Sequence, residues 1–145
     1  MSRPAIYAAL LLGVCAYAFW RGRADERWAA ATCLAASLIS VALLGPVHLR
    51  YSDVEIGVLI IDLLAFSAFT WIALRSDRFW PLWMAGLQLT TTLGHLMKAV
   101  DTDLLPIAYG AALRLWSYPI LIILAIGTWR SHQRGRTRGR APATA

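Results

Sequence analysis

The stretch IGVLIIDLLAFSAFTWIAL, residues Ile56–Leu74, contains one charged side chain, Asp62, in nineteen residues. An α-helix rises 1.5 Å per residue, so a helix of this length spans about 28 Å, close to the roughly 30 Å hydrocarbon core of a bilayer. A helix is the only structure in which one isolated segment satisfies its own backbone polar groups in lipid. The stretch therefore predicts a transmembrane helix.

Four more apolar stretches lie along the chain, at residues 4–20, 28–44, 81–100 and 104–129. The chain has 145 residues, of which 59% are hydrophobic and 15% charged, whereas soluble domains carry about 25% charged residues. The connections between the stretches are too short to hold a soluble domain. The sequence therefore predicts an all-α fold, a single bundle of five transmembrane helices over residues 1–129. A basic, disordered cytoplasmic tail is expected at residues 130–145.

Basic residues predict the orientation of this bundle. Ten arginines would lie on one side of the membrane: Arg21, Arg23, Arg27, Arg75, Arg78, Arg130, Arg134, Arg136, Arg138 and Arg140. The other side would carry Arg3, Arg50 and Lys98. Basic residues concentrate on the cytoplasmic side, so the N-terminus is expected outside and the C-terminus inside. Cleavage of the first stretch as a signal peptide, after Ala16–Ala18, would invert this topology and place the basic tail outside.

Several classes of function lack sequence support. The two cysteines, Cys15 and Cys33, lie in apolar stretches and form no CxxC motif, so they are expected to be small buried side chains rather than metal ligands. The chain contains no Gly-rich phosphate loop, GxSxG or HExxH motif. The carboxylate pairs Asp25–Glu26 and Asp101/Asp103 are expected in loops, in a solvated or topology-setting role. We therefore predict no metal site and no cofactor, and an enzymatic activity is the least favoured hypothesis.

Two of the predicted spans carry small residues at four-residue spacing. They are Thr32, Ala36 and Ser40 in the second span, and Gly86, Thr90 and Gly94 in the fourth. Small residues allow helix backbones to approach closely in a membrane. We interpret both sets as packing faces, used either within one chain or between chains.

Polar side chains in the third, fourth and fifth spans form a candidate site. Gln88, Thr91, His95 and Lys98 recur every three or four residues, so they share one face of a helix. Asp62 and Arg114 are placed at similar depth in the outer half of the membrane, where an unpaired charge is costly. We expect Asp62 to neutralise Arg114, with His95 completing the hydrogen bonds.

Three interpretations of this cluster remain open. It could be a structural network that fixes helix register, or a water-accessible vestibule for a proton, an anion or a small polar solute. Alternatively, residues 104–113 form an interfacial helix, which leaves Arg114 at the surface. Lys98 is near enough to the outer boundary for its ammonium group to reach the interface.

The basic tail predicts an interaction with anionic lipid head groups through Arg130, Arg134, Arg136, Arg138 and Arg140. Nucleic acid is not an expected partner, because the tail is short and lacks interleaved aromatic residues.

The architecture is typical of small integral proteins of bacterial inner membranes. The first functional hypothesis is a non-enzymatic accessory or assembly component that contacts itself or other membrane protein chains through its helices. The second is a small oligomeric transporter or channel that uses the polar cluster, and the third is a membrane enzyme.

Overall fold

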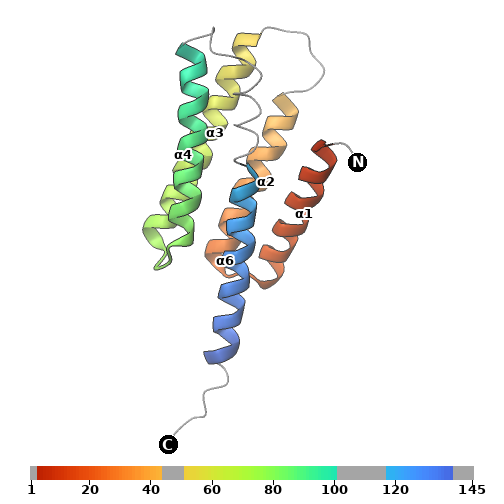
Figure 1. The fold of residues 1–145 in the computed structure, drawn as a ribbon, viewed down its shortest axis with the longest axis vertical. Coiled ribbons are helices and arrows are strands. Elements are labelled where there is room, and N and C mark those ends of the chain that lie inside the picture. The colour runs from red at the N-terminus through yellow and green to blue at the C-terminus, as the bar shows by residue number, and fades with distance from the viewer. Residues whose placement is uncertain (1–2, 44–50, 101–116, 139–145) are drawn as a thin grey trace, which may run out of the picture.

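The structure, a computed structural model, describes residues 3–43, 51–100 and 117–138. Within these ranges the chain is all-α and forms five helices with no strand. They are α1 (Arg3–Arg21), α2 (Ala24–Leu43), α3 (Tyr51–Arg75), α4 (Trp80–Val100) and α6 (Ser117–Arg138) (Figure 1). The all-α prediction is confirmed for this part of the chain.

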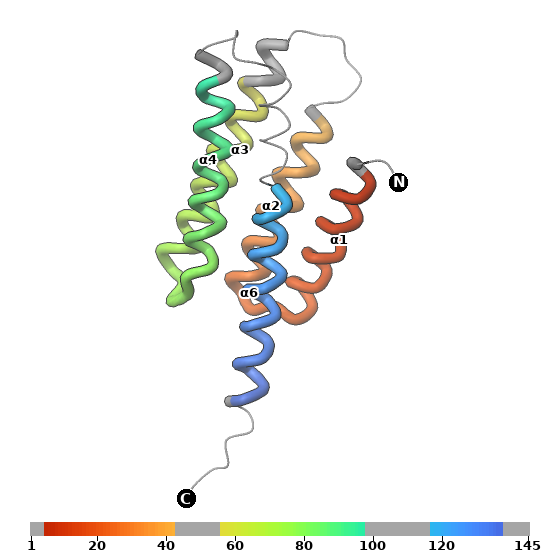
Figure 2. Tube along the Cα trace, in the orientation of Figure 1, coloured from red at the N-terminus to blue at the C-terminus, as the bar shows by residue number. Residues whose placement is uncertain are grey.

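The helices pack as an up-and-down bundle. Helices α1 to α4 each pack against the next along the chain, and α6 closes the bundle by contacting α1, α4 and α2. Figure 2 shows α6 running alongside these helices and then extending beyond the α1–α2 and α3–α4 connections. These connections are short, and only Gly22 and Arg23 separate α1 from α2.

The core lies in the half of the bundle nearer these two connections. It contains Cys15, Ala29, Phe69, Met84 and Leu124, each at most 3% exposed. Both cysteines are buried and free, as expected. Small residues at this level of α1 and α2 allow the two helices to approach, and the larger side chains from α3, α4 and α6 fill the centre.

At the turn between α1 and α2, a glycine is required. A Cβ atom on Gly22 would lie 2.3 Å from the backbone oxygen of Ala18 and 2.8 Å from Cβ of Glu26. The backbone N–H of Gly22 donates to this same Ala18 oxygen at 2.8 Å. The first helix can therefore reverse direction within two residues because position 22 has no side chain.

The four N-terminal helices coincide with the predicted spans to within a few residues, although α3 begins five residues earlier than expected. The fifth predicted span, residues 104–129, is described only from Ser117 onward. The disordered tail predicted at residues 130–145 is wrong for residues 130–138, which continue α6 as a helix. The physical reason is packing, because Ser131 is buried and His132 contacts Arg21 across the bundle.

One helix in the described ranges, Ile56–Arg75, is long and apolar enough to cross a membrane, and Ala5–Arg21 is a shorter apolar helix. Large hydrophobic side chains also remain exposed on every helix, among them Leu12, Leu38, Leu64, Trp83 and Ile122. Soluble monomers seldom expose continuous apolar surface of more than a few hundred Å².

Candidate functional site

The structure brings together three of the predicted polar residues, Asp62 of α3 with Gln88 and His95 of α4, here called the α3–α4 cluster. Nε2 of Gln88 donates a hydrogen bond of 2.9 Å to Oδ1 of Asp62. Nε2 of His95 lies 3.3 Å from Oδ2 of the same carboxylate. Gln88 and His95 are seven residues apart, so they lie on one face of α4 about two turns from each other.

Burial gives this cluster its chemical interest. Gln88 is 7% exposed, and the side chains of Asp62 and His95 are 16% and 23% exposed. An imidazole beside a carboxylate can exchange a proton and can also hold a fixed orientation. The arrangement therefore suits either proton transfer or the fixing of α3 against α4.

Other members of the predicted site do not join this cluster in the described structure. Thr91 is buried, but its hydroxyl donates to the backbone oxygen of Leu87 in its own helix at 3.2 Å. The side chain of Lys98 and the whole of Arg114 lie outside the described residues. The expected pairing of Asp62 with Arg114 therefore stays a prediction.

The two predicted packing faces have different surroundings. In α2, Ala36 packs against the core, and the neighbouring Ser37 shares a hydrogen bond of 3.2 Å with the hydroxyl of Tyr7. Thr32 and Ser40 are half-buried on the same helix. Ser37, beside this face, therefore contacts α1 within the chain.

In α4 the predicted face divides. Gly94 is buried, whereas Gly86 and Thr90 are exposed. A Cβ atom added to Gly86 would meet nothing within 4 Å. The hydroxyl of Thr90 donates to the backbone oxygen of Gly86 at 3.1 Å. The Gly86–Thr90 part of the face therefore points away from the bundle.

Gly86 forms part of an outward-facing groove between α3 and α4, with a volume of about 370 Å³. The residues that line this α3–α4 groove include Phe66, Thr70, Ala73, Leu82, Gly86 and Leu89. Almost all of its surface is apolar. Thr70 is one of the lining residues, and its Oγ1 is buried with no hydrogen-bond partner among the described residues.

At the end of the bundle formed by the α1–α2 and α3–α4 connections is a buried ion pair that sequence reasoning missed. Glu26 was expected to be solvated in a loop, and this expectation is wrong because its side chain is 0% exposed. Its Oε1 lies 2.6 Å from Nη1 of Arg78, and its Oε2 accepts a 2.9 Å hydrogen bond from the backbone N–H of Arg23. Since α2 begins at Ala24, Glu26 occupies the third helical position, where a glutamate caps the helix start.

Further polar contacts strengthen this basic end, which we define by Arg21, Arg23, Arg78 and Arg130. The hydroxyl of Ser76, in the α3–α4 connection, donates to Oδ2 of Asp25 at 2.9 Å. Nη1 of Arg21 lies 3.1 Å from Nε2 of His132 in α6. The two short connections and the extended α6 are thereby joined at one end.

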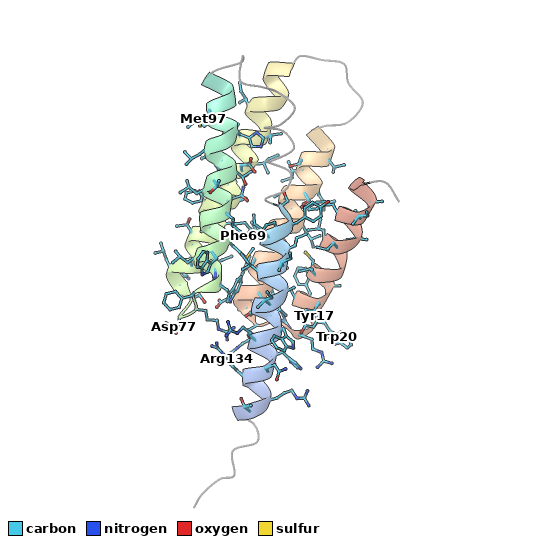
Figure 3. All side chains as sticks on the ribbon, in the orientation of Figure 1. Tyr17, Trp20, Phe69, Asp77, Met97 and Arg134 are labelled. Carbon is cyan, nitrogen blue, oxygen red and sulfur yellow. The ribbon has the colours of Figure 1, made fainter. Side chains whose placement is uncertain are left out.

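A pocket of about 340 Å³ opens at the basic end between the α3–α4 connection, the start of α4 and α6. We call it the arginine pocket because Arg78, Arg130 and Arg134 line it, together with Asp77, Trp80 and Ser131. Figure 3 shows Asp77 and Arg134 at this end, from the α3–α4 connection and α6. Oγ of Ser131 and Nε1 of Trp80 are buried with no hydrogen-bond partner in the described ranges.

The pocket depends on a close helix contact. A Cβ atom on Gly127 would lie 2.9 Å from Cδ2 of the Trp80 indole. The absence of a side chain at position 127 therefore lets α6 approach the indole at the start of α4. A lone glycine in an apolar stretch does not reveal this contact, because the partner lies 47 positions earlier in the chain.

Among the described residues, no group of three His, Cys, Asp or Glu side chains is placed to hold a metal ion. Comparisons with protein-family models, with curated proteins and with solved structures each found no match to this chain.

Proposed function

We propose that this chain is an integral membrane protein with five spans, N-terminus outside and C-terminus inside, in a bacterial inner membrane. The apolar surface of the helices supports this proposal, as does the sequence distribution of the arginines, because this topology would place ten of them inside. Trp20, Trp83 and Trp129 are exposed at the same end of the bundle as Arg21, Arg78 and Arg130. Tryptophan prefers the membrane interface, so both features favour one placement.

Within that membrane we propose a non-enzymatic accessory or assembly role, in which the α3–α4 groove receives a transmembrane helix of another chain. The observation that carries this proposal is the combination of Gly86 and Thr70 in one groove. Gly86 leaves room for a second backbone to approach closely, which favours helix association in lipid. The hydroxyl of Thr70 has no hydrogen-bond partner in the part of the chain that the structure describes. An acyl chain cannot provide one, whereas a helix with a Ser, Thr, Asn or Gln side chain can.

Replacing Gly86 by leucine tests this role. A photo-crosslinking amino acid at Leu89, on the lip of the groove, is expected to capture an apolar helical peptide of another chain in native membranes. Gly86→Leu should abolish this adduct because the new side chain fills the approach path. Mass spectrometry of the adduct identifies the captured peptide.

Gly13 provides the matched control. It is also exposed, and a Cβ atom there would meet nothing within 4 Å. Gly13→Leu on α1 should leave the Leu89 adduct unchanged. Capture of lipid alone at Leu89, or an adduct that survives Gly86→Leu, would reject the groove as the binding site. A captured peptide from this same chain would assign the partner as a second copy.

A second function, proton transport by an oligomer, is favoured by the α3–α4 cluster. Asp62→Asn removes the titratable group but retains an oxygen that accepts from Gln88. In proteoliposomes with an imposed pH gradient, the wild-type chain is expected to carry protons. The proton flux of the Asp62→Asn variant should be at least about tenfold lower than that of the wild type. A pH-sensitive dye trapped inside the vesicles measures it.

Thr91→Val serves as the control for transport, because among the described residues the Thr91 hydroxyl bonds only within its own helix. Its flux should match that of the wild type. A wild-type flux equal to that of empty vesicles, or a normal flux in Asp62→Asn, would remove the transport hypothesis and leave the cluster as a structural contact.

A further inference from the structure

We propose that the arginine pocket is a stoichiometric binding site for the phosphate head group of an anionic phospholipid. This inference rests on the proposed membrane placement, and it differs from diffuse attraction between a basic tail and a charged surface. The pocket combines an apolar wall with two arginines and two buried donors that have no partner among residues 3–43, 51–100 and 117–138.

Two arginines of α6 supply positive charge to the pocket. Arg130 and Arg134 are four residues apart and therefore share one face of α6. Like charges at this spacing repel each other. Neither arginine forms an ion pair in the described part of the chain, whereas Arg78 is already paired with Glu26. The two α6 arginines thus provide positive charge that an anion can neutralise, and guanidinium groups match the geometry of phosphate oxygens.

Two uncharged side chains that line the pocket carry buried hydrogen-bond donors. Ser131 is 4% exposed and lies between the two arginines in sequence, with its Oγ unpaired among the described residues. Nε1 of Trp80 is likewise buried and unpaired. An indole N–H can only donate, and a buried donor without an acceptor is unfavourable. Phosphate oxygens supply the acceptors that neither group has among the described residues.

The remaining wall identifies an amphipathic ligand. Trp83 and Ile126 line the pocket and are 68% and 47% exposed, so an apolar surface continues from the pocket along α4 and α6. A soluble phosphate would leave this surface uncovered, whereas the acyl chains of a lipid would cover it. Asp77 is the one carboxylate in the lining, and it is exposed, where solvent screens its repulsion of an anion.

The site is tested by native mass spectrometry of the full chain in mild detergent, titrated with dioleoylphosphatidylglycerol, with dioleoylphosphatidylcholine or with inorganic phosphate. One phosphatidylglycerol is expected to bind with at least about tenfold higher affinity than phosphatidylcholine, because the phosphocholine head group is neutral overall. Inorganic phosphate should bind more weakly than phosphatidylglycerol. Equal affinity for inorganic phosphate would overturn the lipid assignment, and absence of a bound anion would overturn the site.

Matched variants distinguish binding of the lipid in the pocket from diffuse electrostatic attraction to α6. Arg134→Gln and Arg136→Gln remove the same charge two residues apart on α6, but only Arg134 lines the pocket. We expect Arg134→Gln and Ser131→Ala each to weaken phosphatidylglycerol binding by about tenfold, a typical effect of losing one hydrogen bond to a charged group. Arg136→Gln should stay within about twofold. Equal weakening by the two arginine variants would show diffuse attraction and reject the proposal.

The two proposals can fail separately. Loss of the Leu89 adduct reports on the α3–α4 groove, while the lipid count reports on the arginine pocket between α4 and α6. A chain that binds phosphatidylglycerol but captures no helix would retain the lipid site and lose the assembly role.

Discussion

Replacing Arg78 by methionine is expected to lower the free energy of unfolding by about 3–5 kcal/mol, the usual cost of leaving a buried charge without its partner. The carboxylate of Glu26 is 0% exposed, and its partner Arg78 is only 18% exposed, so water compensates little of the loss. Unfolding in mixed micelles of mild detergent and sodium dodecyl sulfate, followed by circular dichroism, measures the change.

Arg75→Met is the control for this experiment. Arg75 is exposed at the end of α3, and its guanidinium carbon lies 4.5 Å from the ring centre of Trp71. Loss of this contact should cost no more than about 1 kcal/mol. The double variant Glu26→Gln, Arg78→Met should recover part of the stability, because the glutamine oxygen still accepts from Arg23 and carries no charge. Equal destabilisation by Arg78→Met and Arg75→Met would contradict the buried ion pair.

Replacing Gly127 by leucine is expected to lower the free energy of unfolding by about 1–3 kcal/mol, because the new side chain overlaps the Trp80 indole. Its Cβ atom alone would lie 2.9 Å from the ring, and the start of α4 is packed tightly, with Pro81 fully buried. The same micelle titration measures the effect. Gly86→Leu, where the space is open, should leave the stability of the isolated chain within about 0.5 kcal/mol.

Lipid binding provides a second measurement of the effect of Gly127→Leu. If α6 moves away from α4, the arginine pocket changes shape, and phosphatidylglycerol binding should weaken in the same variant. Normal stability together with normal lipid binding in Gly127→Leu would contradict the close contact between position 127 and the Trp80 indole.

Helix positions were predictable from the sequence because apolar length determines them. The stretches at 4–20, 28–44, 56–74 and 81–100 each correspond to one described helix. The extension of α6 through Arg138 was not predictable in the same way. Its sequence is basic and rich in glycine near Gly135, which favours disorder, but Ser131 and His132 contact the rest of the bundle.

The α3–α4 cluster was predictable in part. Helical periodicity places Gln88 and His95 on one face, and the opposite directions of two consecutive spans bring Asp62 to a similar depth. Periodicity says nothing about which rotamer each side chain adopts, so Thr91 was included although it bonds to its own helix. The arginine pocket could not be foreseen, because it depends on Gly127 and Trp80 meeting across 47 positions.

Glu26 is an instructive case. Counting charges between apolar stretches assigns every loop carboxylate to water. A glutamate three residues after the residue that caps a helix is typical of a helix start, and Glu26 stands in this position relative to Arg23. The pattern was weak, because arginine is not a usual capping residue. What decided its burial was Arg78, 52 positions away.

The polar contacts at the basic end have a mechanical consequence. Glu26 with Arg78, Asp25 with Ser76 and Arg21 with His132 join the two helical hairpins to α6 at one end, next to the packed core. These contacts hold the helices together at the basic end, so relative motion of the helices is expected to be smallest there. Asp62 lies on α3 and His95 on α4, so bending of one helix relative to the other would change the 3.3 Å distance between Oδ2 of Asp62 and Nε2 of His95.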